Sequence, residues 1–217
     1  MSPLLDLVGL TALMVISVVS VMWYFRERKK ILKLMRDFVV ELEEVFKPVD
    51  KTYTLLGYLV GFRAVYKLHN GDQLYVLFTT APRYAFLYLP FVKLLGREDL
   101  ATYFYKTEKP KRLRTYIAVR EKSRRISTIV ESDIKRLGLT LQQTTVETPA
   151  GRYVVYYELG GSPYLINEVV NKFNVDIRKL AVYGSLNAVE ITTPSLLGHV
   201  EKIWDLIKKM YKTATIS

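Results

Sequence analysis

The hydrophobic pattern of this chain begins with an uninterrupted apolar run and then changes to a helical periodicity. Residues 7–25, LVGLTALMVISVVSVMWYF, are nineteen positions without a charge. A helix of that length, at about 1.5 Å per residue, matches the roughly 30 Å hydrocarbon thickness of a bilayer. The run therefore predicts a transmembrane anchor over residues 1–25, with Trp23 and Tyr24 at the membrane interface.

A secretory signal peptide is the alternative interpretation of the run. Its pattern requires basic residues before a shorter apolar segment and small residues at a cleavage site after it. Here the first basic residue is Arg26, and Trp23-Tyr24-Phe25 occupy the place of the small residues. The anchor is favoured. Because every Lys and Arg follows it, we expect a single-pass protein with the N-terminus outside and the remainder in the cytoplasm.

The segment 26–47 alternates apolar and charged positions at three- and four-residue spacing. This spacing predicts an amphipathic helix that continues from the anchor and ends before Pro48, since the residue before a proline is biased away from helical geometry. The apolar positions are Ile31, Leu32, Leu34, Met35, Phe38, Val39, Leu42, Val45 and Phe46.

After Pro48 the pattern becomes mainly that of strands. The runs 61–68 and 72–80 flank Asn70-Gly71, a strong hairpin signal because the favoured turn needs positive φ at both central residues. We expect a third strand over 84–89, limited by Pro90. Residues 91–105 predict a short helix or two half-helices around Gly96.

The remaining pattern predicts further hairpins with helices between them, which favours an α+β domain with antiparallel strands rather than a parallel α/β sheet. This cytosolic domain covers 48–217, and a division into lobes 51–138 and 139–217 stays open. We expect strands over 113–119, 141–147, 152–159, 180–183 and 188–192, and helices over 126–137, from Ser162-Pro163 and from Pro194-Ser195.

Composition excludes several kinds of chemistry. The chain has no cysteine, which excludes disulfides, thiolate metal sites and cysteine nucleophiles and suits a reducing compartment. Its two histidines, His69 and His199, lie far apart without a metal-binding spacing. We therefore expect no catalytic residue, cofactor site or metal site, and no small-molecule substrate.

Two short motifs resemble sites but have ordinary structural interpretations. Gly160-Gly161-Ser162 before a helix could hold a phosphate, yet Pro163 removes one of the amides that would face it, so a strand-to-helix turn is favoured. Arg97-Glu98-Asp99 contains two carboxylates, but adjacent residues do not face each other on a helix. Helix-end charge is the favoured interpretation.

Charge is the most informative functional feature. The net charge is +11, and residues 26–217 carry +12 because Asp6 is the only charged residue before Arg26. Such a field favours polyanions, either RNA or an anionic membrane surface. The candidate contact residues form two clusters. They are Arg26, Arg28, Lys29, Lys30, Lys33 and Arg36 in the first, and Lys109, Lys111, Arg112, Arg114, Arg120, Lys122, Arg124 and Arg125 in the second.

Small residues within the apolar run predict a surface for packing against another helix in the bilayer. Small side chains allow two backbones to approach closely. The candidates are Gly9, Thr11, Ala12, Ser17 and Ser20.

The order of these parts resembles the calumin family of endoplasmic-reticulum proteins. The similar features are the span followed by basic residues, the helix VELEEVF, the segment 94–100 (LLGREDL), the strand at 113–119, and the step 189–194 (VEITTP) into a last helix. The resemblance implies a basic cytosolic α+β domain at the ribosome, beside membrane-protein insertion machinery. The family's long charged C-terminal helices have no counterpart before Ser217, which leaves ribosome contact to 26–36 and 106–125.

These features lead to a non-enzymatic, membrane-anchored accessory factor for insertion or assembly of membrane proteins. Its expected partners are the lipid bilayer, insertase-type integral membrane proteins and ribosomal RNA. The alternative is a docking subunit of another membrane complex without ribosome contact. A membrane-bound enzyme is a third class, for which the sequence nominates no residues.

Overall fold

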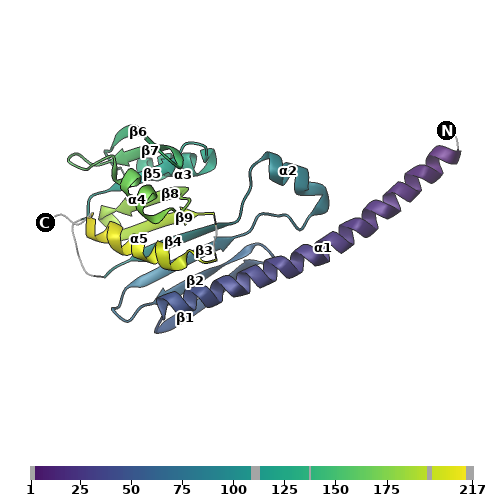
Figure 1. Cartoon of the computed structure of the whole chain (residues 1–217), viewed down its shortest axis with the longest axis horizontal. Helices are drawn as coiled ribbons and strands as arrows, with labels where there is room; N and C mark the ends of the chain where they lie inside the picture. The colour runs from purple at the N-terminus through teal and green to yellow at the C-terminus, as the bar shows by residue number, and fades with distance from the viewer. Residues whose placement is uncertain (1–2, 109–112, 137, 195–196, 214–217) are drawn as a thin grey trace.

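The computed structural model describes residues 3–108, 113–136, 138–194 and 197–213. In this part of the chain, a domain of helices and antiparallel strands lies at one end of a single long helix, α1 (Pro3–Phe46), as Figure 1 shows. The α+β prediction is confirmed. Continuity between the apolar run and the amphipathic segment is also confirmed, and α1 is long and apolar enough to cross a membrane.

Nine strands of the described residues form one sheet in the order β1-β2-β3-β4-β9-β8-β5-β7-β6, and all neighbours are antiparallel. The strands are β1 Asp50–Gly57, β2 Gly61–Lys67, β3 Gln73–Thr79, β4 Leu100–Lys106, β5 Tyr116–Arg120, β6 Gln142–Thr148, β7 Gly151–Tyr157, β8 Lys179–Tyr183 and β9 Ala188–Thr193. Both predicted hairpins, β2–β3 and β6–β7, are confirmed.

The strand order interleaves the two halves of the chain. β5 comes from residues 51–138, yet it pairs on one side with β7 and on the other with β8, which both come from 139–217. β9 likewise pairs with β4. Strands from both segments that the sequence left open as lobes are therefore hydrogen-bonded neighbours.

Helices cover the two faces of the sheet unequally. The C-terminal half of α1, α4 (Leu165–Phe173) and α5 (Val200–Thr213) bury their apolar sides in one large core with the sheet. The other face is covered over β5, β7 and β8 by α3 (Arg124–Arg136), whose Val130 packs with Ile117 and Val119. Since both faces are covered here, β5 and β8 are buried along nearly their whole length and do not alternate between apolar and polar positions.

The second half of α1 is part of the domain rather than a stalk. Five apolar side chains recur along its inner face and are buried, and the Phe38 ring lies 5.0 Å from that of Phe78 on β3. They are Ile31, Met35, Phe38, Leu42 and Phe46. Because they join the core of the sheet, the apolar run is coupled rigidly to the domain.

The connection between β3 and β4 differs from its prediction. The strand expected at 84–89 is wrong, because a short 3₁₀ turn, η1 (Phe86–Tyr88), and the helix α2 (Leu89–Leu94) lie there. Pro90 occupies the first turn of α2, where its fixed φ and missing N–H suit a helix. The helix expected over 91–105 is correct only to Leu94, since 100–106 is β4.

Two helix starts differ from the sequence prediction, and one strand has no counterpart in it. α4 begins at Leu165 after Tyr164, which gives no side-chain cap, so Ser162-Pro163 belongs to the preceding turn. α5 begins at Val200 rather than after Pro194-Ser195, and Ser195 lies outside the described residues. β1, an exposed edge strand, was not predicted at all.

Candidate functional site

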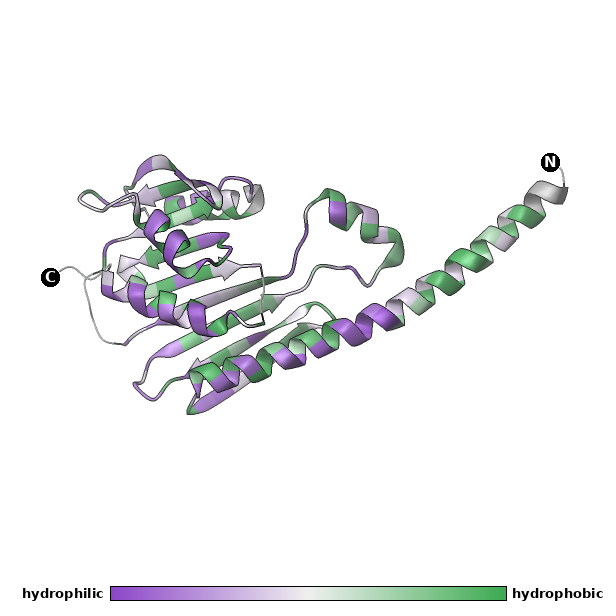
Figure 2. Ribbon diagram, viewed as in Figure 1, coloured by the Kyte–Doolittle hydropathy of each residue, from purple (hydrophilic) through white to green (hydrophobic). Residues whose placement is uncertain are grey.

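Residues 7–22 of α1 project away from the domain, and all of their side chains except the half-buried Ser20 are exposed. None of the apolar window is buried against the rest of the described chain. Figure 2 shows this half of the helix mostly green, with the hydrophilic positions beginning where it reaches the domain. Exposed apolar patches of this size mark contact with a membrane or another protein.

The small residues of the run do not all share one face. At roughly 100° per residue, Gly9, Ala12 and Ser20 lie on one side of α1, with Ser17 at its edge and Thr11 on the opposite side. Thr11 and Ser17 donate their hydroxyls to the carbonyls of Leu7 and Leu13, each at 2.8 Å. Gly9, Ala12 and Ser20 therefore form the small-residue stripe. The space beside Gly9 is open, because a Cβ added there would meet nothing within 4 Å.

The first basic cluster forms a coherent surface. Helical spacing puts five of its members on one side of α1, opposite the buried stripe, and all five are exposed. Arg28 is the exception, because its guanidinium lies 5.1 Å from the centre of the Tyr58 ring. The five form the basic face of α1 and are Arg26, Lys29, Lys30, Lys33 and Arg36.

The domain contacts α1 at Trp23 and Tyr24, the two residues that the sequence predicts at the membrane interface. Trp23 donates its indole N–H to the carbonyl of Arg83 at 2.9 Å, and its ring lies 5.9 Å from Phe86. Tyr24 packs edge-on against Tyr84 at 6.3 Å. The β3–β4 connection is therefore attached to α1 at the point where the apolar run ends.

A buried ion cluster strengthens this attachment. Glu27, only 4% exposed, lies 3.7 Å from the Arg83 guanidinium and accepts a hydrogen bond from Lys30 at 2.6 Å. Arg83 also pairs with Asp99 at 2.9 Å, and Asp99 accepts the backbone N–H of Ala81 at 2.8 Å. Both ends of the connection are thereby linked to α1.

The second basic cluster is not brought together as one free surface. Arg114 donates to the carbonyl of Gly160, and Arg120 donates to Asp176 at 2.5 Å and to the carbonyl of Ala150. Lys122 is exposed. Lys109, Lys111 and Arg112 lie outside the described residues, as do the side chains of Arg124 and Arg125 at the start of α3.

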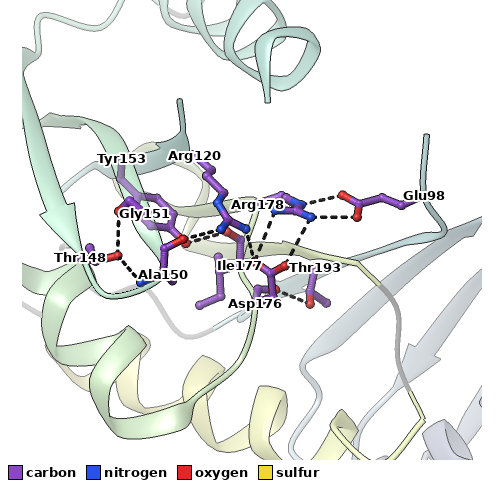
Figure 3. Close-up of polar contacts among 10 residues, drawn as sticks. All are labelled: Glu98, Arg120, Thr148, Ala150, Gly151, Tyr153, Asp176, Ile177, Arg178 and Thr193. Carbon is purple, nitrogen blue, oxygen red and sulfur yellow. Dashed lines mark hydrogen bonds and ion pairs between the residues drawn. The ribbon is translucent and has the colours of Figure 1, made fainter. Parts of the chain in front are cut away.

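Figure 3 shows the network that holds Arg120. Asp176 also pairs with Arg178, whose guanidinium makes two hydrogen bonds to Glu98 at 2.6 and 2.8 Å. The Glu98 carboxylate is the main reason that the pKa of Arg178 is raised. The Tyr153 hydroxyl donates to the Ile177 carbonyl at 2.8 Å, so the network connects β7, the start of β8 and the end of the connection.

This arrangement corrects the interpretation of Arg97-Glu98-Asp99. α2 ends at Leu94, so the two carboxylates are not helix-end charges. Glu98 binds Arg178 and Asp99 binds Arg83. Each carboxylate is paired with an arginine from another part of the chain, so both are structural cross-links.

The chemistry available elsewhere is limited. A hollow of about 350 Å³ is lined by Arg120, Lys122, Ala150 and Arg152 among others, but Arg120 and Arg152 already bind carboxylates. Within the described ranges, no three His, Asp or Glu side chains are placed to hold a metal ion. The best-defined candidate surface is the end of the domain beside Trp23.

Sequence reasoning missed the attachment residues Arg83, Asp99 and Glu27. The sequence does offer one indication of Glu27, because it is the only acidic residue in the segment 26–36, which holds the six basic residues of the first cluster. A lone carboxylate there predicts an arginine or lysine partner. Nothing in the pattern shows that this partner is more than fifty residues away.

Comparison with known proteins adds no assignment. No protein-family model matches this chain, and no curated protein matches it.

Proposed function

We propose that the protein is a non-enzymatic, membrane-anchored accessory factor that docks other integral membrane proteins and assists their insertion or assembly. The apolar run crosses the bilayer, with the N-terminus outside and the sheet domain in the cytoplasm. The observation that carries the proposal is the continuity of α1, which enters the core at Ile31 without a break. A rigid coupling of this kind transmits the position of a bound membrane helix to the domain.

The small-residue stripe Gly9, Ala12 and Ser20 is the contact for a partner helix in the bilayer. The basic face of α1 contacts anionic headgroups, where each charge contributes about 1 kcal/mol close to the surface. Positive charge at this place also supports the proposed orientation. The resemblance to the calumin family supports the same role.

Native purification of the full chain in mild detergent tests the docking. We expect an integral membrane protein to copurify, and we expect Gly9→Leu with Ala12→Leu to abolish the association without loss of folding. Val8→Leu with Val15→Leu, which also enlarges exposed positions of the run, is the matched control. Recovery of the protein alone from the native source, or equal loss with both variants, contradicts the proposal.

Ribosome contact is the more specific form of the proposal, and 26–36 is the better placed of the two basic clusters to make it. Arg114 and Arg120 donate to the domain itself, whereas the basic face of α1 is exposed. Membrane extracts should cosediment with ribosomes, and reversal of Lys29, Lys33 and Arg36 to Glu should remove this association at moderate salt. Unchanged cosedimentation contradicts it.

A docking subunit of another membrane complex, without ribosome contact, is the second candidate. The engagement of Arg114 and Arg120 within the protein favours it, because fewer cations of the second cluster are left for RNA. A stoichiometric complex that copurifies in the absence of ribosomes identifies this role.

A further inference from the structure

Exposed apolar side chains gather at one end of the sheet. In the β3–β4 connection, Leu87 is 69% and Leu94 is 84% exposed, and Phe91 and Leu95 are exposed beside them. In the β1–β2 turn, Tyr58 and Val60 are also exposed. We call these six residues the apolar rim.

The strand register places both parts of the apolar rim together. Gly57 pairs with Gly61, Gly61 with Thr79, and Thr79 with Leu100. The β1–β2 turn and the β3–β4 connection therefore leave the sheet side by side. Figure 1 shows α2 projecting from the domain on the side toward which the free half of α1 extends.

The contacts with α1 set the level of the apolar rim along the proposed span. Phe86, directly before Leu87, packs on Trp23, and Tyr58 lies over Arg28. These positions bracket the change from apolar to charged residues at Phe25 and Arg26. If Trp23 lies at the interface, the rim lies at the same depth, beside the lipid headgroups.

The β3–β4 connection also carries the cations expected of a segment in contact with lipid. Lys93 lies on α2, and the Arg97 guanidinium lies 5.7 Å from the centre of the Tyr88 ring. Long basic side chains can extend to phosphates while their apolar neighbours enter the acyl boundary. The Glu27–Arg83–Asp99 cluster holds the connection in place.

We propose that the apolar rim inserts into the leaflet from which α1 emerges, so that the domain sits directly on the bilayer and not at the end of a stalk. The occupant of the rim is lipid. The inference rests on the proposed membrane span, and it adds a second membrane contact with its own residues.

The absence of native cysteine permits a direct test. Leu94→Cys, Leu87→Cys and Leu159→Cys are labelled separately with an environment-sensitive fluorophore, and each full chain is reconstituted into phosphatidylcholine and phosphatidylglycerol vesicles. Lipids that carry a quencher near the headgroup are then added. Val15→Cys, with a quencher near the bilayer centre, reports on the span.

Leu159 is the matched control. It is 81% exposed, almost as much as Leu94, but it follows β7 at the opposite end of the sheet. The register can be followed across the sheet from this end of β7. Tyr157 pairs with Tyr116 on β5, and Tyr116 pairs with Val182 on β8. The next residue, Tyr183, pairs with Ala188 on β9, and Ala188 pairs with Lys106 on β4. Lys106 is the end of β4 far from Leu100.

We expect lipid quenching at Leu94 and Leu87 to exceed that at Leu159 by roughly twofold or more, as for side chains inserted at the headgroup boundary. Equal quenching at all three positions overturns the inference. Blue-shifted emission at Leu94 without lipid quenching also overturns it, and assigns the rim to a protein surface. An unquenched Val15 label overturns both this inference and the proposed span, whereas a quenched Val15 with unquenched Leu94 removes the inference alone.

Discussion

At the scale of single residues, two buried tyrosines of the core differ in one hydrogen bond. Tyr153 donates its hydroxyl to the Ile177 carbonyl, whereas the Tyr103 hydroxyl has no partner among the described residues. Both rings are fully buried. A buried hydroxyl without a partner costs its desolvation free energy, and a satisfied one does not.

Removing the two hydroxyls should therefore have opposite effects. We expect Tyr103→Phe to leave the free energy of unfolding unchanged or raise it by about 1 kcal/mol, and Tyr153→Phe to lower it by about 1 kcal/mol. Denaturant unfolding of the two variants measures this. A loss of stability in Tyr103→Phe as large as that in Tyr153→Phe contradicts the expectation.

The buried tyrosines also predict the response to alkali. Burial raises the pKa of Tyr66 to about 12, and it raises the pKa of Tyr103, Tyr116 and Tyr183 as well. The protonated form is favoured in the folded state, so the stabilisation is complete below the unfolded pKa of about 10 and is lost as the pH rises through the folded values.

Each such tyrosine should reduce the free energy of unfolding by about 1.4 kcal/mol per pH unit above pH 10, until its folded pKa is reached. We expect the ultraviolet absorbance of tyrosinate to rise in two steps, the second coinciding with loss of circular dichroism. A single step at ordinary tyrosine pKa, with the fold intact, is the opposite result.

At the scale of elements, the start of α5 is determined by a residue of α1. Both carboxylate oxygens of Glu41 lie 2.9 Å from the backbone N of Gly198, and one lies 3.2 Å from that of Val200. These amides have no partner within the helix, and a carboxylate there also interacts favourably with the helix dipole. α5 begins after Gly198 for this reason, and not at the Pro-Ser step.

Loss of this cap should be measurable. We expect Glu41→Ala to lower the free energy of unfolding by about 1 kcal/mol, the usual cost of losing a side chain that caps a helix. Glu44→Ala, an exposed position of the same helix, should change it by less than about 0.5 kcal/mol. Thermal unfolding of both variants checks this, and equal shifts would show that Glu41 does not cap α5.

At the scale of the whole molecule, α1 has two parts with different roles. The first is exposed, and the second provides buried side chains from Ile31 to Phe46. Removal of 1–25 should leave a folded domain, because the core contacts remain. Removal of 1–47 should expose the inner face of β2–β4 and prevent folding.

Circular dichroism during thermal unfolding shows which of the two truncated proteins is folded. The shorter deletion should unfold cooperatively, although Trp23 and its contact with Arg83 are lost. The longer one should lack a cooperative transition or aggregate. A cooperative transition in the longer deletion would contradict the expectation that the domain needs the buried side chains of α1 to fold.

The sequence by itself determined the long helix, both hairpins and the α+β class, because these depend on apolar spacing and local turn chemistry. Asn70-Gly71 specifies its turn locally, and the stripe from Ile31 to Phe46 specifies which side of α1 is buried. Only the tertiary structure decided the strand order, the start of α5 and the position of the β3–β4 connection. Glu27, Arg83 and Asp99 are distant in sequence, and a pairing between distant charges leaves no periodic signal. The apolar rim is likewise decided by the tertiary structure. The register of the sheet brings its two parts together at the place where the apolar run ends.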